Sequence, residues 1–133
     1  MSEIFRWPVR VYYEDTDASG VAYHANYLRW FERARSEWLR SLGRSHTVLA
    51  EQHGAAFTLA RVEVDYRRPA RLEDLLEVSL EVAERGRASL IFAQRLHRAG
   101  DPGAVLATAR VRVACVDIGT FKPRPWPTGW LDD

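Results

Sequence analysis

The stretch of sequence that decides the fold is Asn26–Leu42, NYLRWFERARSEWLRSL. Its apolar side chains recur every three or four residues, which places them on one face of an α-helix, and charged residues occupy most of the other positions. Gly43 follows as a C-cap, and Arg40 and Arg44 carry positive charge where the helix dipole is negative. The sequence therefore predicts one long amphipathic helix, with one or two further turns at Thr47–His53.

Alternating apolar and polar residues predict strands on both sides of this helix. One strand precedes the helix and four follow it, at Phe5–Tyr13, Ala60–Arg67, Leu76–Val82, Ala88–Leu96 and Val105–Ile118. Short turns favour antiparallel pairing, and a single helix covers only one face of such a sheet. The opposite face carries charged residues, namely Glu63, Asp65, Glu77, Glu81, Arg95, Arg110 and Arg112. The prediction is one α+β domain over residues 1–133, in which a five-stranded antiparallel sheet packs against one long helix.

The two free edges of a five-stranded sheet invite pairing with another chain. We therefore expect a homodimer, joined either through sheet edges or through the helix layer.

The composition limits the classes of function. With 19 Lys and Arg against 18 Asp and Glu, the net charge is +1, which argues against nucleic-acid binding. No apolar run is long enough to cross a membrane, and the N-terminus lacks the apolar core of a secretory signal, so we expect no membrane insertion. Cys115 is the only cysteine, which excludes an intrachain disulfide and favours a cytoplasmic location. The four histidines show no metal-ligand spacing, and no metal site is predicted.

The segment Tyr13–Asn26, YEDTDASGVAYHAN, brings two carboxylates and a histidine to the start of the predicted helix. A helix N-terminus presents free N–H groups that stabilise a carbonyl oxygen as it becomes an oxyanion. A carboxylate beside it can attack the carbonyl carbon or take a proton from water. The pattern indicates acyl-transfer hydrolysis, provided that Asp17 and the first helical N–H groups face one cleft.

This segment has two other interpretations. Aspartates in turns commonly form Asx turns or cap helices, and a lone histidine before a helix commonly caps or packs. The run Asp15-x-Asp17-x-Ser19-Gly20 also matches the first six positions of an EF-hand loop. Position twelve, however, is Asn26 rather than a bidentate Glu, and a strand rather than a helix precedes the run. We therefore expect no calcium site.

The segment Arg10–Arg35, RVYYEDTDASGVAYHANYLRWFERAR, resembles the hotdog-fold acyl-CoA thioesterases. Within them it is similar to the 4-hydroxybenzoyl-CoA thioesterase branch, and most of all to the Tol-Pal system-associated acyl-CoA thioesterases. The resemblance continues through Asp65–Val78 and Cys115–Pro125 and so covers nearly the whole chain. It implies a hotdog fold, an acyl-CoA substrate, dimers with active sites at the subunit interface, and tetramers made of two dimers. CoA is then part of the substrate, and no separate cofactor is expected.

The resemblance also implies residue roles. The second aspartate of D-T-D is the catalytic carboxylate of the family, which corresponds to Asp17. The backbone amide of His24 polarises the thioester carbonyl and its side chain assists, while Tyr23 and Asn26 shape the acyl or pantetheine end of the pocket. The sequence differs from the family at Ser19, where members often carry Gly. It differs again at His24-Ala25, where the 4-hydroxybenzoyl enzymes have Tyr-Pro, which weakens the case for an aromatic substrate.

Four basic residues in the later parts of the resemblance are candidates for binding the phosphates of CoA. We hypothesise that Lys122 and Arg124, together with Arg67 or Arg68, hold the nucleotide end, because Lys and Arg bind phosphate by charge and hydrogen bonds. The alternative is a solvated basic tail. At the level of the whole protein, the alternatives are a hotdog protein that binds CoA or acyl groups without hydrolysis, and an envelope-associated adaptor.

Overall fold

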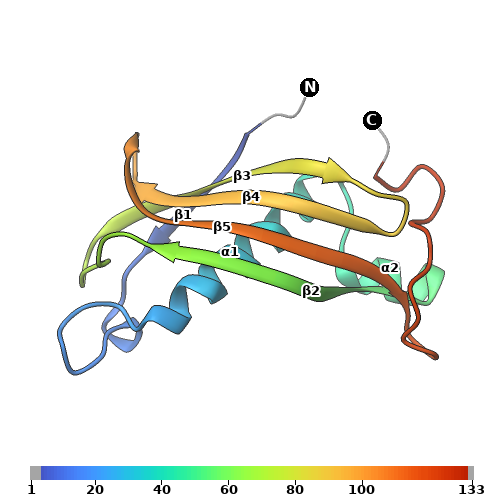
Figure 1. Cartoon of the computed structure of the whole chain (residues 1–133), viewed down its shortest axis with the longest axis horizontal. Coiled ribbons are helices and arrows are strands. Elements are labelled where there is room, and N and C mark those ends of the chain that lie inside the picture. The colour runs from blue at the N-terminus through green and yellow to red at the C-terminus, as the bar shows by residue number, and fades with distance from the viewer. Residues whose placement is uncertain (1–3, 132–133) are drawn as a thin grey trace.

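A five-stranded antiparallel sheet forms the main layer of the structure, a computed structural model that describes residues 4–131 (Figure 1). Its strands are β1 (Phe5–Arg10), β2 (Ala55–Tyr66), β3 (Leu75–Arg85), β4 (Ser89–Arg98) and β5 (Asp101–Asp117). They lie in the order β1-β3-β4-β5-β2, and every neighbouring pair is antiparallel. The predicted α+β class and sheet are confirmed, with β1 and β2 as the two edges.

The long helix α1 (His24–Ser41) packs on one face of this sheet and supplies much of the core. Trp30, Phe31 and Ala34 are buried against the inward side chains of the central strands, which include Leu76, Val78, Leu80, Phe92, Leu96 and Val111. Gln94 is the polar exception in this layer, at 1% exposed, and its amide donates a hydrogen bond to the Phe31 carbonyl over 2.9 Å. The single predicted amphipathic helix therefore covers the sheet as expected.

The end of strand β1 and the start of helix α1 differ from the predicted residues. Strand β1 stops at Arg10, because the chain turns into the short 3₁₀ helix η1 (Tyr13–Asp15) and the Tyr12 N–H binds the Asp15 carboxylate. Helix α1 starts at His24, two residues earlier than predicted, and Gly43 follows it with a φ of 76°, a conformation that favours glycine.

The second helix and the start of β2 follow α1 in the chain. Helix α2 (His46–His53) is capped by the Ser45 hydroxyl, which accepts the Val48 N–H over 3.1 Å. Strand β2 starts at Ala55, five residues before the predicted start. A bulge between Leu59 and Arg61 shifts the alternation of its side chains, so the period-2 pattern revealed only the second half of the strand.

Two loop regions lie at opposite ends of the sheet (Figure 1). The segment that precedes α1 lies beside the end of β2, since the Ala22 N–H binds the Ala70 carbonyl over 2.7 Å. The C-terminal segment lies at the start of β2, where Ile118 donates to the Gly54 carbonyl over 2.9 Å. One edge strand thus connects the two regions from which the site residues were predicted.

Candidate active site

The loop from Asp17 to Val21 folds back on itself and brings Asp17 beside the start of α1. The Asp17 N–H binds the Val21 carbonyl over 2.9 Å, and the Gly20 N–H binds the Asp17 carbonyl over 3.1 Å. Gly20 has a φ of 84°, which a residue with a Cβ adopts only with strain. A bridge between Thr16 and Ala22 closes the loop.

The carboxylate of Asp17 is exposed and held through one of its two oxygens. Both the N–H of Ser19, at 2.8 Å, and its hydroxyl donate to Oδ1, so the Asx turn considered from sequence is present. The Ser19 hydroxyl, then its N–H, and to a smaller extent the charge of His24 hold the pKa of Asp17 below its usual value. Asp17 is therefore ionised at neutral pH. Within residues 4–131, its Oδ2 has no hydrogen-bond donor and is free to react.

The N-terminus of α1 carries unused donors next to this carboxylate. No side chain caps the helix at Tyr23, whose own N–H binds the Asp15 carbonyl over 2.8 Å. The Asn26 N–H binds the Tyr23 carbonyl over 2.9 Å. The N–H groups of His24 and Ala25 have no acceptor among the described residues. Two free amides at the positive end of a helix dipole are suited to bind an oxyanion.

Asp15 and Asn26 hold the loop through hydrogen bonds between them. The two carboxylate oxygens of Asp15 accept the Tyr12 N–H at 2.8 Å and the Asn26 amide at 3.3 Å. The same Asn26 amide also binds the Asp15 carbonyl over 3.1 Å, and Asn26 is only 4% exposed. This arrangement favours Asp17 over Asp15 as the reactive carboxylate. It gives Asn26 a contact that positions the loop, and the pocket-shaping role that the resemblance implied stays a prediction.

Tyr66 and Tyr27, to which no site role was assigned from the sequence, complete the surroundings. The Tyr66 hydroxyl donates to the His24 carbonyl over 3.0 Å, and the Tyr27 hydroxyl accepts the Ala70 N–H over 2.8 Å. The rings of Tyr23 and His24 are in contact, with centroids 4.6 Å apart. A position two residues after an aspartate is the usual partner in an Asx turn, which is the signal that could have identified Ser19. No local signal marked Tyr66, whose contact spans 42 residues of sequence.

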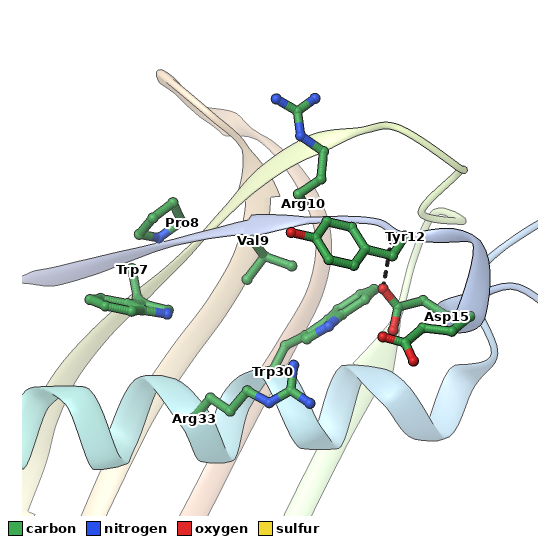
Figure 2. Close-up of a pocket in the computed structure, with 9 residues that line it drawn as sticks. Trp7, Pro8, Val9, Arg10, Tyr12, Asp15, Trp30 and Arg33 are labelled. Carbon is green, nitrogen blue, oxygen red and sulfur yellow. Dashed lines mark hydrogen bonds between the residues drawn. The ribbon is translucent and has the colours of Figure 1, made fainter.

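One cavity lies between β1, η1 and α1, has a volume of about 200 Å³, and is lined by Asp15 but not by Asp17. Figure 2 shows Trp30 in this cavity, with Asp15 at one end and Arg33 rising from α1. A second cavity, of about 320 Å³, lies between α1, α2 and the first half of β2, and Asp17 does not line it either. The expected cleft shared by Asp17 and the helix amides is therefore not one of these two cavities of a single chain.

The predicted phosphate-binding cations do not meet within one chain. The side chains of Arg67 and Arg68 follow β2 near the Asp17 loop and have no partner in the described part of the chain. Lys122 and Arg124 lie at the other end of β2 (Figure 1). Arg124 is occupied, because its guanidinium binds the His53 carbonyl over 2.8 Å and lies 3.6 Å from the Asp117 carboxylate.

Over residues 4–131, no three His, Cys, Asp or Glu side chains gather in a way that could hold a metal ion. No helix in this range is both long and apolar enough to span a membrane.

Comparisons with known proteins show the family to which the chain belongs. A family model described as the thioesterase superfamily matches residues 19–112. The chain is 50% identical over 123 residues to "Acyl-CoA thioesterase YbgC" of Haemophilus influenzae, covering 92% of this chain and 88% of the relative. It is 47% identical to "Acyl-CoA thioester hydrolase YbgC" of Escherichia coli, covering 93% and 90%. The crystal structure of a probable thioesterase from Bartonella henselae superimposes with a TM-score of 0.87 at 34% identity, covering 94% of this chain and all of that one. The chain belongs to the thioesterase superfamily, and its sheet wrapped on one long helix is the hotdog fold of these enzymes.

Proposed function

We propose that this protein hydrolyses acyl-CoA thioesters, with Asp17 as the reacting carboxylate and the amides of His24 and Ala25 as the oxyanion site. The observation that carries the proposal is an ionised carboxylate in the loop that leads into α1, whose first turn has two free N–H groups. The names of the relatives, which are acyl-CoA thioesterases, support the substrate class.

In the proposed reaction the thioester carbonyl oxygen binds the free helix amides, which stabilise the negative charge that develops on it. Asp17 Oδ2 then either attacks the carbonyl carbon or takes a proton from an attacking water. In the first case a C–O bond forms, the C–S bond breaks, and water hydrolyses the resulting mixed anhydride. In both cases the products are the free acid and CoA thiol. A thiolate leaves readily, since its conjugate acid has a pKa of about 8.5. The scheme needs neither a metal nor a separate cofactor.

The test is the release of CoA thiol from a panel of acyl-CoAs by the wild type and by Asp17→Asn. We expect Asp17→Asn to lower kcat by at least about a hundredfold with folding intact, because the amide neither attacks nor accepts a proton. Asp101→Asn is a matched control: Asp101 accepts the N–H of Gly103 in a similar turn, far from α1 in sequence. Near-normal turnover of Asp17→Asn would exclude the role of Asp17. A wild type that binds the esters without releasing thiol would favour the non-hydrolytic alternative.

We also propose that the active unit is a homodimer paired through the free edges of two β2 strands. Leu59, on the helix-facing side of β2, is 56% exposed, and the outer edge of the strand has no neighbour in the sheet. Antiparallel pairing of two such edges would continue the sheet and cover this apolar side chain. It would also enclose the Asp17 loop, which lies at the end of β2 and is open in one chain.

This pairing would bring together the basic residues that lie apart in one chain. It would put the end of β2 in one subunit beside the start of β2 in the other. Lys122 of one subunit would then approach Arg67 and Arg68 of its partner, and the three would bind the CoA phosphates. Arg124, which is already bound to Asp117 and His53, would hold the tail in place.

Three further points stand as proposals. A cytoplasmic location is supported by the single, buried Cys115. Assembly of two dimers into a tetramer and an association with the Tol-Pal system are supported only by the sequence resemblance.

A further inference from the structure

The cavity of about 320 Å³ between α1, α2 and β2 combines apolar walls with a polar side. Its apolar lining comes from Ala56, Phe57, Leu59 and Val113, and its polar lining from Glu32, Arg35, Ser36, His46 and Thr58. The reaction proposed above uses none of these polar residues, so the cavity has a role still to be explained.

Hydrogen bonds fix the donors and acceptors on the polar side. The Ser36 hydroxyl lies 3.0 Å from Glu32 Oε2 and 3.1 Å from His46 Nε2. Because Ser36 has a single proton and a carboxylate only accepts, Ser36 donates to Glu32 and accepts from the Nε2–H of His46. Burial lowers the pKa of His46, so its ring is neutral at neutral pH, and Nδ1 carries a free lone pair. This polarity is the reverse of a serine nucleophile activated by histidine, so these groups are suited to hydrogen bonding rather than to nucleophilic attack.

Arg35 adds a cation to the same wall. Its guanidinium donates to the buried Gln94 side chain over 2.9 Å and has no carboxylate within ion-pair distance in the described chain. Burial lowers its pKa to about 10, which leaves it charged at neutral pH. A purely apolar guest would desolvate the Arg35 guanidinium and leave the free lone pair of His46 Nδ1 without a donor, which is unfavourable. A hydroxyl group, which both donates and accepts, matches them.

In the dimer proposed above, this cavity would receive part of the substrate of the partner subunit. The Asp17 loop lies at the end of β2, where Tyr66 binds His24, and the cavity lies at the start of β2, at residues 56–59. Antiparallel pairing of two β2 edges about the middle of the strand would place the cavity of one subunit beside the Asp17 loop of the other. The distal part of an acyl group bound at Asp17 would then enter the partner's cavity.

We infer that this cavity, supplied by the partner subunit, selects acyl groups with an apolar body and a distal hydroxyl group, and that Ser36 and His46 are its specificity-determining residues. The inference rests on the proposed thioesterase activity and deepens it by naming the class of acyl group.

The first experiment compares kcat/KM for 6-hydroxyhexanoyl-CoA and hexanoyl-CoA, which share chain length and differ in the distal hydroxyl. We expect the wild type to favour the hydroxylated ester by about tenfold, the effect of one well-made hydrogen bond with its partner groups otherwise left unpaired. Ser36→Ala and His46→Phe should reduce that ratio to near one. Ser41→Ala is the matched control, since Ser41 lies on the same helix, binds the Trp38 carbonyl and does not line the cavity.

A second experiment asks which subunit supplies the cavity, with co-expressed heterodimers purified through two different tags. One subunit is wild type and the other carries Asp17→Asn, so the single working site combines the Asp17 of the first with the cavity of the second. Adding Ser36→Ala to the Asp17→Asn subunit should remove the selectivity, whereas adding it to the other subunit should preserve it.

The outcomes separate the two proposals. A wild type that hydrolyses neither ester overturns the proposed function. A wild type that hydrolyses both esters with equal kcat/KM, or a ratio that Ser36→Ala and His46→Phe leave unchanged, overturns this inference alone. Equal effects of Ser36→Ala in the two heterodimers would overturn the assignment of the cavity to the partner subunit.

Discussion

The hydroxyl of Tyr66 donates a hydrogen bond to the backbone carbonyl of His24 over 3.0 Å, and so connects the last residue of β2 to the first residue of α1. The ring of Tyr66 also lies edge-on to the rings of His24 and Tyr27, with centroids 6.0 and 5.2 Å away. An edge strand thus helps to set the position of the helix end that carries the free amides.

Replacing Tyr66 by Phe should weaken this connection while keeping the ring contacts. We expect a loss of about 0.5–1.5 kcal/mol in the free energy of unfolding, the usual value of one hydrogen bond, and a decrease of kcat by about fivefold. Thermal unfolding and steady-state kinetics measure the two effects. Tyr13→Phe is the control, because the Tyr13 side chain is 83% exposed. Unchanged kcat in Tyr66→Phe would show that this bond does not position the amides.

Ser19→Ala should move the pH dependence of the reaction. The Ser19 hydroxyl is the largest cause of the lowered pKa of Asp17, so its removal raises that pKa toward the ordinary value of 3.8. Because the reaction requires the ionised carboxylate, the acid limb of kcat/KM should shift to higher pH, with activity retained at neutral pH. The pH–rate profiles of wild type and variant measure the shift. Acid limbs at the same pH would argue against Asp17 as the titrating group.

Two substitutions at His24 separate the roles of its backbone and side chain. His24→Pro removes the N–H, and the first turn of a helix tolerates proline. Tyr23 already has the extended conformation, with φ −62° and ψ 131°, that a residue before proline adopts. We expect His24→Pro to lower kcat by about 10²–10³-fold, the effect of losing one oxyanion donor.

His24→Ala keeps the N–H and removes only the imidazole, so its kcat should decrease much less than that of His24→Pro. Circular dichroism of both variants checks that the helix is preserved. Equal kinetic losses in the two variants would assign the main role to the side chain instead of the amide.

The cation hypothesis predicts an effect on substrate binding. Lys122→Ala and Arg67→Ala should each raise KM for CoA thioesters and leave KM unchanged for a short thioester without the nucleotide, since only CoA carries the phosphates. Arg124→Ala should instead lower the Tm, because Arg124 holds the tail through His53 and Asp117. An equal rise of KM for both types of thioester would exclude phosphate binding.

Part of the site could be predicted from the sequence because it depends on residues that are close together in the chain. The turn formers of Asp15–Gly20 next to a helix start indicated a carboxylate beside free N–H groups, and Asx-turn chemistry requires only residues two apart. The first and last residues of the strands were predicted less well. The bulge between Leu59 and Arg61 concealed the first half of β2, and the Asp15–Tyr12 contact ended β1 earlier than its alternation suggested.

By itself, the sequence determined the α+β class, the single long helix and the loop that carries Asp17, because periodicity and turn chemistry act over a few residues. Only the tertiary structure decided which carboxylate is free. Asp15 is held by the distant Asn26 amide, whereas Asp17 keeps one oxygen unpaired. It also separated Arg67 and Arg68 from Lys122, and placed Ser36 and His46 around one cavity, because contacts between distant segments depend on how the helices pack on the sheet.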